Sequence, residues 1–326
     1  MDYFFTQSAY VLLDHAPIPD EIHRALSDWG FSVTRYEHGI DLLTAAEASV
    51  VFEVISLDDQ QTSILVDSMN CPWPDQVTDK EPVLFLSWHS GALGPFVYFG
   101  CLERAIQECR TWNGATQAVK RHKALLRLRV AHKKGYQAEW KSKGEAKKYD
   151  LIEELAFVHR CLMALDKVSG VLGYFFPGGE ALCSRETLFE TWEYYTNHGY
   201  KPFDLWIMWI NRRLGRTPEE PDWAVVDIVG LAPVGDTDLE ACFPHTRYDS
   251  NQVANWLLNV ASYLYDNGPI IEDGHTLTGP GGIDWQAYRY ESSLQFPARP
   301  ILCLRPLDSS RLPRRFLKRL PVSSEK

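Results

Sequence analysis

The chain has 326 residues, of which 45% are hydrophobic and 13% aromatic, and its formal net charge is −10. This composition excludes a disordered protein, and the length suits about two units of globular structure. No stretch approaches the ~18 to 20 apolar residues of a membrane span, and the first residues lack a signal-peptide pattern. We therefore expect a cytoplasmic protein with no membrane partner. The seven cysteines are widely spread without a Cys-x-x-Cys pair, which predicts free thiols.

The first part of the sequence predicts strands arranged around one helix. The run 9–14 is apolar and typical of a buried strand, and a proline-containing break separates it from a helix over about 20–29. Further β-rich runs lie at 31–37, 49–56 and 62–67. The order strand, helix, strand, strand, strand favours an α+β layer with antiparallel pairing.

The stretch 81–109 is the best place in the sequence for a site. Its predicted elements are an apolar strand, a glycine-rich corner and an amphipathic helix, over 83–88, 89–95 and about 96–109. Trp88 and His89 lie where the strand meets the corner, and side chains at a strand end often project into a cleft. The same residues also suit a packing corner between the N-terminal layer and the segment that follows.

Basic residues are concentrated in one segment. Eleven of the 33 Lys and Arg residues lie between Lys120 and Lys148, where there are two acidic residues. In the run 124–130, Arg127 and Arg129 alternate with apolar residues, which predicts a strand with an exposed basic face. Two interpretations stay open: the segment attracts an acidic partner, or it is a solvated linker lying on the acidic surface of the protein itself.

The second half predicts another α+β layer. Asp150, Ser184 and Asp249 are N-cap residues for helices over 151–166, 184–198 and 250–266. Strands are predicted at 170–176, 203–210, 223–229, 285–291 and 299–305. The fold class is therefore α+β, with mixed, largely antiparallel sheets, helices packed on one face, and two related sub-layers. The expected division is an N-terminal subdomain, a basic strand with a mobile loop, a C-terminal domain and a basic tail, over 1–114, 115–149, 150–308 and 309–326.

No specific catalytic signature is present: the sequence has no phosphate-binding loop, dinucleotide fingerprint, His-Glu-x-x-His pair, nucleophile elbow or zinc-type Cys/His array. We expect no metal and no cofactor. The candidate catalytic residues are imidazoles and a loop carboxylate: His89, His122, Asp273 and His275. The candidate binding residues are aromatic or charged: Trp88, Arg127, Arg129, Trp140 and Glu272.

Three motifs in the second half resemble an uncharacterised bacterial family, domain of unknown function 4261. They are Tyr174-Phe-Phe-Pro-Gly, Trp223-Ala-Val-Val-Asp-Ile-Val-Gly-Leu, and Tyr263-Leu-Tyr-Asp-Asn-Gly-Pro-Ile-Ile-Glu-Asp-Gly-His-Thr-Leu. The family domain covers mainly residues 223–304. The resemblance implies an α+β fold and carries no established catalytic residues.

The function expected from these features is recognition of another protein, with a basic protein as one option, in a neutralising, immunity-like role within a bacterial toxin, secretion or defence system. The acidic body suits a basic partner, and aromatic residues are enriched at interfaces. One alternative is a hydrolase or metal-dependent enzyme with a His/Asp site, which requires the candidate residues to converge. A further alternative is nucleic-acid binding, which requires an exposed stripe containing Arg127 and Arg129. The sequence leaves the oligomeric state open.

Overall fold

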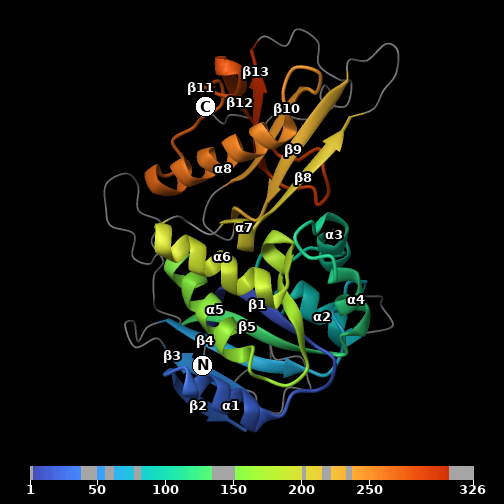
Figure 1. Ribbon diagram of the computed structural model, residues 1–326, viewed down its shortest axis with the longest axis vertical. Coiled ribbons are helices and arrows are strands. Elements are labelled where there is room, and N and C mark those ends of the chain that lie inside the picture. The colour runs from blue at the N-terminus through green and yellow to red at the C-terminus, as the bar shows by residue number, and fades with distance from the viewer. Residues whose placement is uncertain are drawn as a thin grey trace. The chain divides into compact units, whose positions relative to one another are not determined.

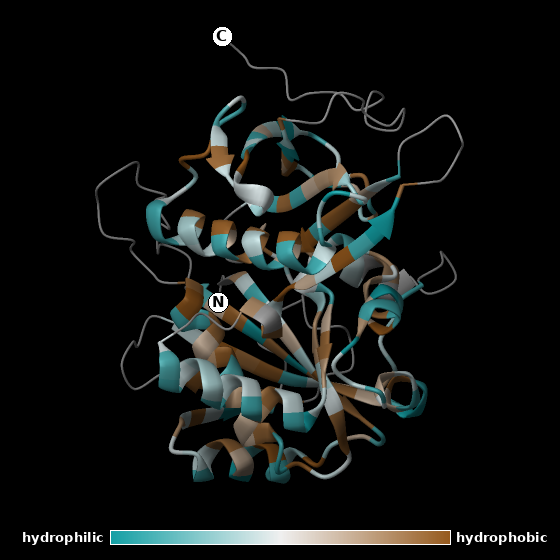
Figure 2. Cartoon of the chain, turned by 45° about the horizontal axis from the view of Figure 1, so that its top comes forward, coloured by the Kyte–Doolittle hydropathy of each residue, from teal (hydrophilic) through white to brown (hydrophobic). Residues whose placement is uncertain are grey.

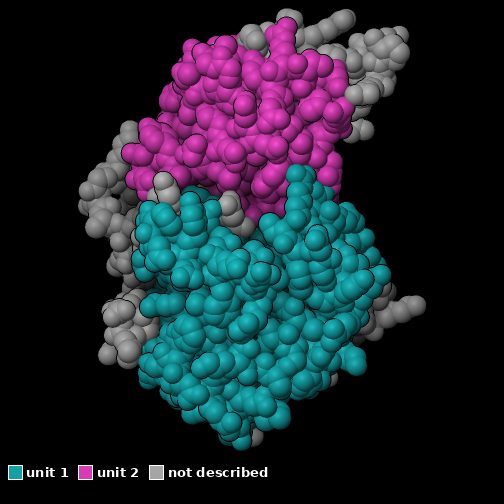
Figure 3. Space-filling model, viewed as in Figure 1, with its two compact units in different colours: residues 1–206 teal, residues 207–326 magenta. Residues whose placement is uncertain are grey.

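The computed structural model describes residues 3–37, 50–55, 62–76, 82–133, 151–199, 203–214, 222–232 and 237–307. The chain forms two compact units, Met1–Trp206 and Ile207–Lys326 (Figure 3). Each unit combines a sheet with helices (Figure 1). This division differs from the expected one. The expected segment 115–149 is not separate, because its strand is part of the first sheet, and the expected domain 150–308 is divided between the two units. The expected tail, 309–326, lies outside the described residues.

Unit 1 contains an antiparallel sheet in the order β2-β3-β4-β5-β1-β6-β7. Its strands are β1 (Tyr3–Leu13), β2 (Ser32–Tyr36), β3 (Val51–Ile55), β4 (Thr62–Met69), β5 (Ala124–Lys133), β6 (Val171–Phe176) and β7 (Ala181–Cys183). The apolar run at the end of β1 explains its central place, since every residue from Ala9 to Leu13 is fully buried. A strand buried on both faces needs cover on both sides.

Helices of unit 1 cover both faces of this sheet. They are α1 (Pro19–Asp28), α2 (Pro82–His89), α3 (Cys101–Glu108), α4 (Ala115–Arg121), α5 (Leu151–Leu165), α6 (Arg185–His198) and the short α7 (Phe203–Trp206). On one face, Tyr10 and Leu12 pack against residues of α3 and α4. On the other face, α5 reaches His132 of β5 through Glu154. In this unit the expected arrangement of helices on one face therefore does not apply.

Unit 2 contains a sheet in the order β11-β12-β13-β10-β9-β8, in which only the β10–β13 pair of described strands is parallel. The elements are β8 (Met208–Arg213), β9 (Trp223–Val229), β10 (Asp238–Pro244), α8 (Ser250–Asn267), β11 (Thr276–Thr278), β12 (Asp284–Tyr290) and β13 (Ile301–Pro306). Helix α8 packs against β9 and β10 with its apolar residues, while its other side is polar (Figure 2). The α+β class with largely antiparallel sheets is thus confirmed.

The prediction of a strand over 83–88 is wrong. Residues Pro82–His89 form α2, and the next helix, α3, starts only at Cys101. A short apolar run has no periodicity that distinguishes a strand from a buried helix, and a proline suits the first turn of a helix. The predicted strand over 203–210 is also shortened, because Phe203–Trp206 is helical and β8 begins at Met208.

Candidate functional site

An exposed group of aromatic rings lies on the stretch 81–109, and we call it the aromatic patch. It consists of Phe85, Trp88, His89 and Phe99. The Trp88 and Phe99 rings are stacked with centroids 4.4 Å apart, and the Phe85 and His89 rings lie 4.2 Å apart. Phe85 is 40% exposed and Phe99 is 43% exposed. Single exposed apolar side chains are common on protein surfaces, whereas a contiguous group of them is a feature of interaction surfaces.

The buried side of the aromatic patch is held by the segment Cys71-Pro-Trp-Pro-Asp75, which we call the elbow around Trp73. The Trp88 indole packs edge-on against Trp73 at 5.9 Å, and its Nε1–H donates to the carbonyl oxygen of Pro74 at 2.9 Å. Asp75 accepts hydrogen bonds from the backbone N–H groups of Leu102 and Glu103 in the first turn of α3. The elbow therefore contacts both α2, which carries Phe85, Trp88 and His89, and the start of α3, directly after Phe99, and these contacts hold the patch in position.

His122 has a structural position beneath this elbow. The backbone N–H of Trp73 donates to Nε2 of His122 at 2.8 Å, so the ring proton is on Nδ1, which donates to the carbonyl oxygen of Val119. Burial lowers the pKa of His122, and the bond to Val119 only partly opposes this effect. His89, in contrast, is an exposed member of the aromatic patch.

The expectation that β5 exposes a basic face to solvent is wrong. Arg127 and Arg129 are 0% and 1% exposed, and both guanidinium groups contact the carboxylate of Asp67 on β4. Arg127 also donates to the carbonyl oxygen of Ala92, and Arg129 lies 4.4 Å from the centre of the Phe5 ring. The alternating pattern correctly places both arginines on the same side of β5, but that side is buried in the core. The exposed stripe required for nucleic-acid binding therefore lacks these two arginines.

The remaining candidates are surface groups or fall outside the described residues. In unit 2, the His275 ring accepts a hydrogen bond from the backbone N–H of Glu272, and Asp273 accepts one from the backbone of Arg289. Their side chains are exposed, that of Glu272 to 75%. Trp140 lies outside the described residues. No three of the four catalytic candidates share a unit, because His89 and His122 belong to unit 1 and the other two to unit 2.

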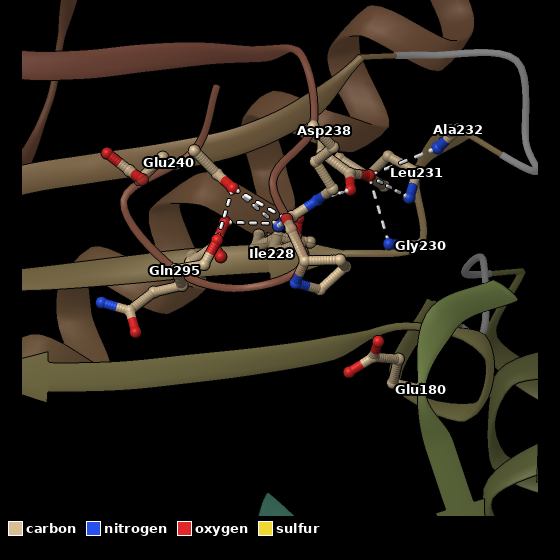
Figure 4. Close-up of polar contacts among 12 residues, drawn as sticks. Glu180, Ile228, Gly230, Leu231, Ala232, Asp238, Glu240 and Gln295 are labelled. Atoms are coloured by element: carbon tan, nitrogen blue, oxygen red, sulfur yellow. Dashed lines mark hydrogen bonds and ion pairs between the residues drawn. The ribbon is translucent and has the colours of Figure 1, made fainter. Parts of the chain in front are cut away.

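A second feature, in unit 2, is a buried group of charges around Arg299, which we call the arginine cluster (Figure 4). Its side chains are Asp227 on β9, Asp238 and Glu240 on β10, and Arg299 at the end of the 291–300 loop; none is more than 4% exposed. Arg299 uses all five of its N–H donors. They go to Asp238 Oδ2, Ser293 Oγ, Pro297 O, Asp227 Oδ1 and Ile228 O.

The aspartate carboxylates of the arginine cluster accept different numbers of hydrogen bonds. Asp238 Oδ1 accepts three backbone N–H groups, from Gly230, Leu231 and Ala232, and its other oxygen accepts from Arg299. Asp227 receives one hydrogen bond on Oδ1, from Arg299 at 2.7 Å, and none on its buried Oδ2. The pKa of Asp227 is raised to about 7. Burial is the largest cause, Arg299 opposes it in part, and the nearby Glu240 and Asp238 also raise the pKa.

The arginine cluster is not among the residues predicted from the sequence, although the sequence contains a signal for it. Asp227 interrupts the apolar run 223–229, and Asp238 and Glu240 alternate with apolar residues in β10. A carboxylate at a position with a buried pattern needs a partner, which predicts a buried cation elsewhere in the chain. The pattern does not identify this cation as Arg299, because the position of Arg299 depends on the conformation of the 291–300 loop.

Two features are absent from the part of the chain that the structure describes. The described residues contain no group of three or more His, Cys, Asp or Glu side chains arranged to hold a metal ion. No helix in the described part combines the length and apolar character that crossing a membrane requires.

Comparison with known proteins gives one match, in unit 2. No curated protein and no solved structure matches the chain. The match begins at the first carboxylate of the arginine cluster and ends beyond Arg299, so it contains the whole cluster. It confirms the resemblance for the C-terminal part of the chain, and the Tyr174 motif lies outside it. Residues 227–305 match the family described as domain of unknown function (DUF4261).

Proposed function

We propose that this protein is a non-enzymatic recognition protein that binds another protein through the aromatic patch. The supporting observation is the stack of Trp88 on Phe99, with Phe85 and His89 beside it, exposed on a surface that the elbow holds rigid. Aromatic side chains bury a large area on binding at low entropic cost and are enriched among the residues that dominate binding energy. A pre-positioned patch loses little freedom when a partner docks.

Charge favours a basic partner. The chain carries a net charge of −10, and Glu103, four residues after Phe99 in the sequence, is exposed. The guanidinium of Arg104, which donates to the Phe99 carbonyl oxygen, is paired with Glu180. The two arginines of β5 are buried against Asp67 and present no positive charge at the surface. A basic partner would be attracted over long range, and its Lys or Arg side chains would also be favoured over the faces of exposed rings. Neutralisation of a basic toxin-like protein, as expected from the sequence, is one form of such recognition.

The test compares proteins recovered by three versions of the full chain. One is the wild type, one carries Phe85→Ser and Phe99→Ser, and one carries Tyr263→Ser as the control, because Tyr263 is a 48% exposed aromatic residue of α8 outside the patch. We expect at least one protein to be recovered by the wild type and the control and lost with the patch variant. Calorimetry with that purified partner should then show weaker binding at higher salt.

Recovery of the same proteins by all three versions would exclude the aromatic patch as the binding surface. Circular dichroism of the patch variant is part of the test, because the replaced side chains are exposed and the fold should be unchanged. If the protein that the patch variant fails to recover has no net positive charge, the aromatic patch is still the binding surface, but the proposed preference for a basic partner is wrong.

A further inference from the structure

The arginine cluster connects the 291–300 loop to the face of the unit 2 sheet that α8 does not cover. Asp227 lies directly opposite Glu240 across the β9–β10 pair, and both point to the same side as Val225 and Cys242. The loop contacts this side at two points. Arg299 reaches Asp227 and Asp238, and the backbone N–H of Leu294 donates to Glu240 at 2.9 Å.

The charged and titratable groups around Asp227 come from several elements. β10 contributes Asp238 and Glu240, and the loop contributes Arg299. β8 places apolar Ile210 opposite Asp227, and its next residue on that face, Arg212, is exposed. β13 places the thiol of Cys303 opposite Glu240, with Arg305 two residues further along the same face.

Within this arrangement, Asp227 is the carboxyl group least able to carry a charge. Its side chain is fully buried, Arg299 has no donor left for Oδ2, and two other carboxyl groups lie nearby. An ionised oxygen without a donor in such a place is costly, whereas a protonated Oδ2 removes the charge and can itself donate. If the loop lifts away, water reaches the carboxyl group and the cost of ionisation falls.

We propose that Asp227 is a proton-binding site that controls how firmly the 291–300 loop is held on the sheet. The loop is closed most firmly when Asp227 carries its proton, and loss of the proton shifts the equilibrium toward the open loop. This inference concerns unit 2 and does not depend on the role of the aromatic patch.

The direction with pH follows from linkage. The closed loop binds the proton more tightly than the open loop, so opening becomes easier as the pH rises from the ordinary carboxyl range to about 7 and then levels off. Each pH unit within that range changes the opening equilibrium by about tenfold. Between pH 5 and pH 8 we expect roughly 50- to 100-fold more frequent opening of the loop.

Amide hydrogen exchange of the full chain at pH 5 and pH 8, corrected for the intrinsic pH dependence of exchange, measures this opening. The wild type should lose protection in the 291–300 loop at pH 8. Asp227→Asn, which cannot ionise, should retain similar protection at both pH values, and Asp266→Asn, an exposed carboxylate of α8, should behave like the wild type.

Two results would overturn the proposal. One is equal corrected protection of the wild-type loop at both pH values. The other is loss of protection in α8 in step with the loop, which would indicate unfolding of unit 2 as a whole. A carbon-13 titration of the Asp227 carboxyl group in the wild type tests the site without any substitution, and titration in the ordinary range of an exposed Asp would also contradict it.

Discussion

Arg127 donates to both carboxylate oxygens of Asp67, through Nε at 2.8 Å and Nη2 at 2.5 Å, and neither side chain is exposed to water. Burial alone would raise the pKa of Asp67, but Arg127 and Arg129 reverse this effect and hold it below its ordinary value. The bond joins β4 to β5 in the middle of the unit 1 sheet. Removing one partner from such a pair leaves a buried charge without compensation.

We therefore expect Asp67→Asn to lower the free energy of unfolding by about 3 kcal/mol or more, because two buried guanidinium groups lose their counter-charge. Urea denaturation measures the change. The matched control is Asp20→Asn, which removes the exposed Asp20–Arg35 pair and should lower the free energy of unfolding far less, because water screens the two charges. Equal effects of the two substitutions would mean that burial of the Asp67 pair contributes nothing to its strength.

Arg299→Lys tests whether the arginine cluster depends on guanidinium geometry or only on positive charge. A lysine has three donors on one atom and cannot reach the five acceptors that surround Arg299. We expect a loss of about 2 to 4 kcal/mol in the free energy of unfolding of unit 2. Arg247→Lys, at an exposed position in the same unit, should stay within about 0.5 kcal/mol of the wild type. A similarly small effect of Arg299→Lys would show that charge alone is sufficient.

The sequence predicts those features of the fold that depend on local chemistry. The buried run at the end of β1, the N-caps Ser184 and Asp249, and the helix end at Gly199 all appear as expected. Each is decided by residues within a few positions of one another: a side-chain oxygen bonds the N–H groups of the next turn, or a glycine adopts the left-handed conformation that ends a helix.

What the sequence does not predict depends on distant partners. Alternation places Arg127 and Arg129 on one side of β5, but the carboxylate that compensates their charges in the core, Asp67, lies sixty residues before Arg127. The aromatic patch could not be predicted from the sequence for a related reason. Phe85 belongs to α2 and Phe99 to the turn before α3, and Trp73, from an earlier segment of the chain, packs against Trp88 beneath the stacked rings of Trp88 and Phe99. Periodicity describes which face a residue is on and contains no information about what covers that face.

The N-cap of α8 allows the hydrogen-bonding and the charge contributions to be separated. Asp249 accepts hydrogen bonds from the backbone N–H groups of Asn251 and Gln252, both at 3.0 Å. Asp249→Ala removes these bonds and should cost about 1 kcal/mol in the free energy of unfolding. Asp249→Asn keeps an accepting oxygen and loses only the favourable charge at the helix start, so it should cost about 0.5 kcal/mol. If the two substitutions cost the same, the cap stabilises the helix through charge alone.

His159 of α5 gives unit 1 a defined acid sensitivity. Its ring stacks on Trp192 with centroids 4.3 Å apart, its Nε2 donates to the carbonyl oxygen of Leu188 at 3.2 Å, and its buried Nδ1 has no partner. Burial lowers its pKa to about 3, against a weak opposing effect of the Leu188 carbonyl. The native state therefore keeps a neutral imidazole at pH values where the unfolded chain has already bound a proton.

Between pH 6.5 and about 3 the unfolded state binds one more proton at this residue than the native state does, so the contribution of His159 to stability falls as the pH is lowered. The expected slope is about 1.4 kcal/mol per pH unit. His159→Phe keeps the stacking on Trp192 and has no proton to bind, so urea denaturation at pH 4.5 and 7 should show a smaller loss of stability than in the wild type. His198→Phe, at an exposed position, should retain the wild-type dependence. If His159→Phe also retained it, the acid sensitivity would have to come from other groups, because a neutral ring cannot produce it.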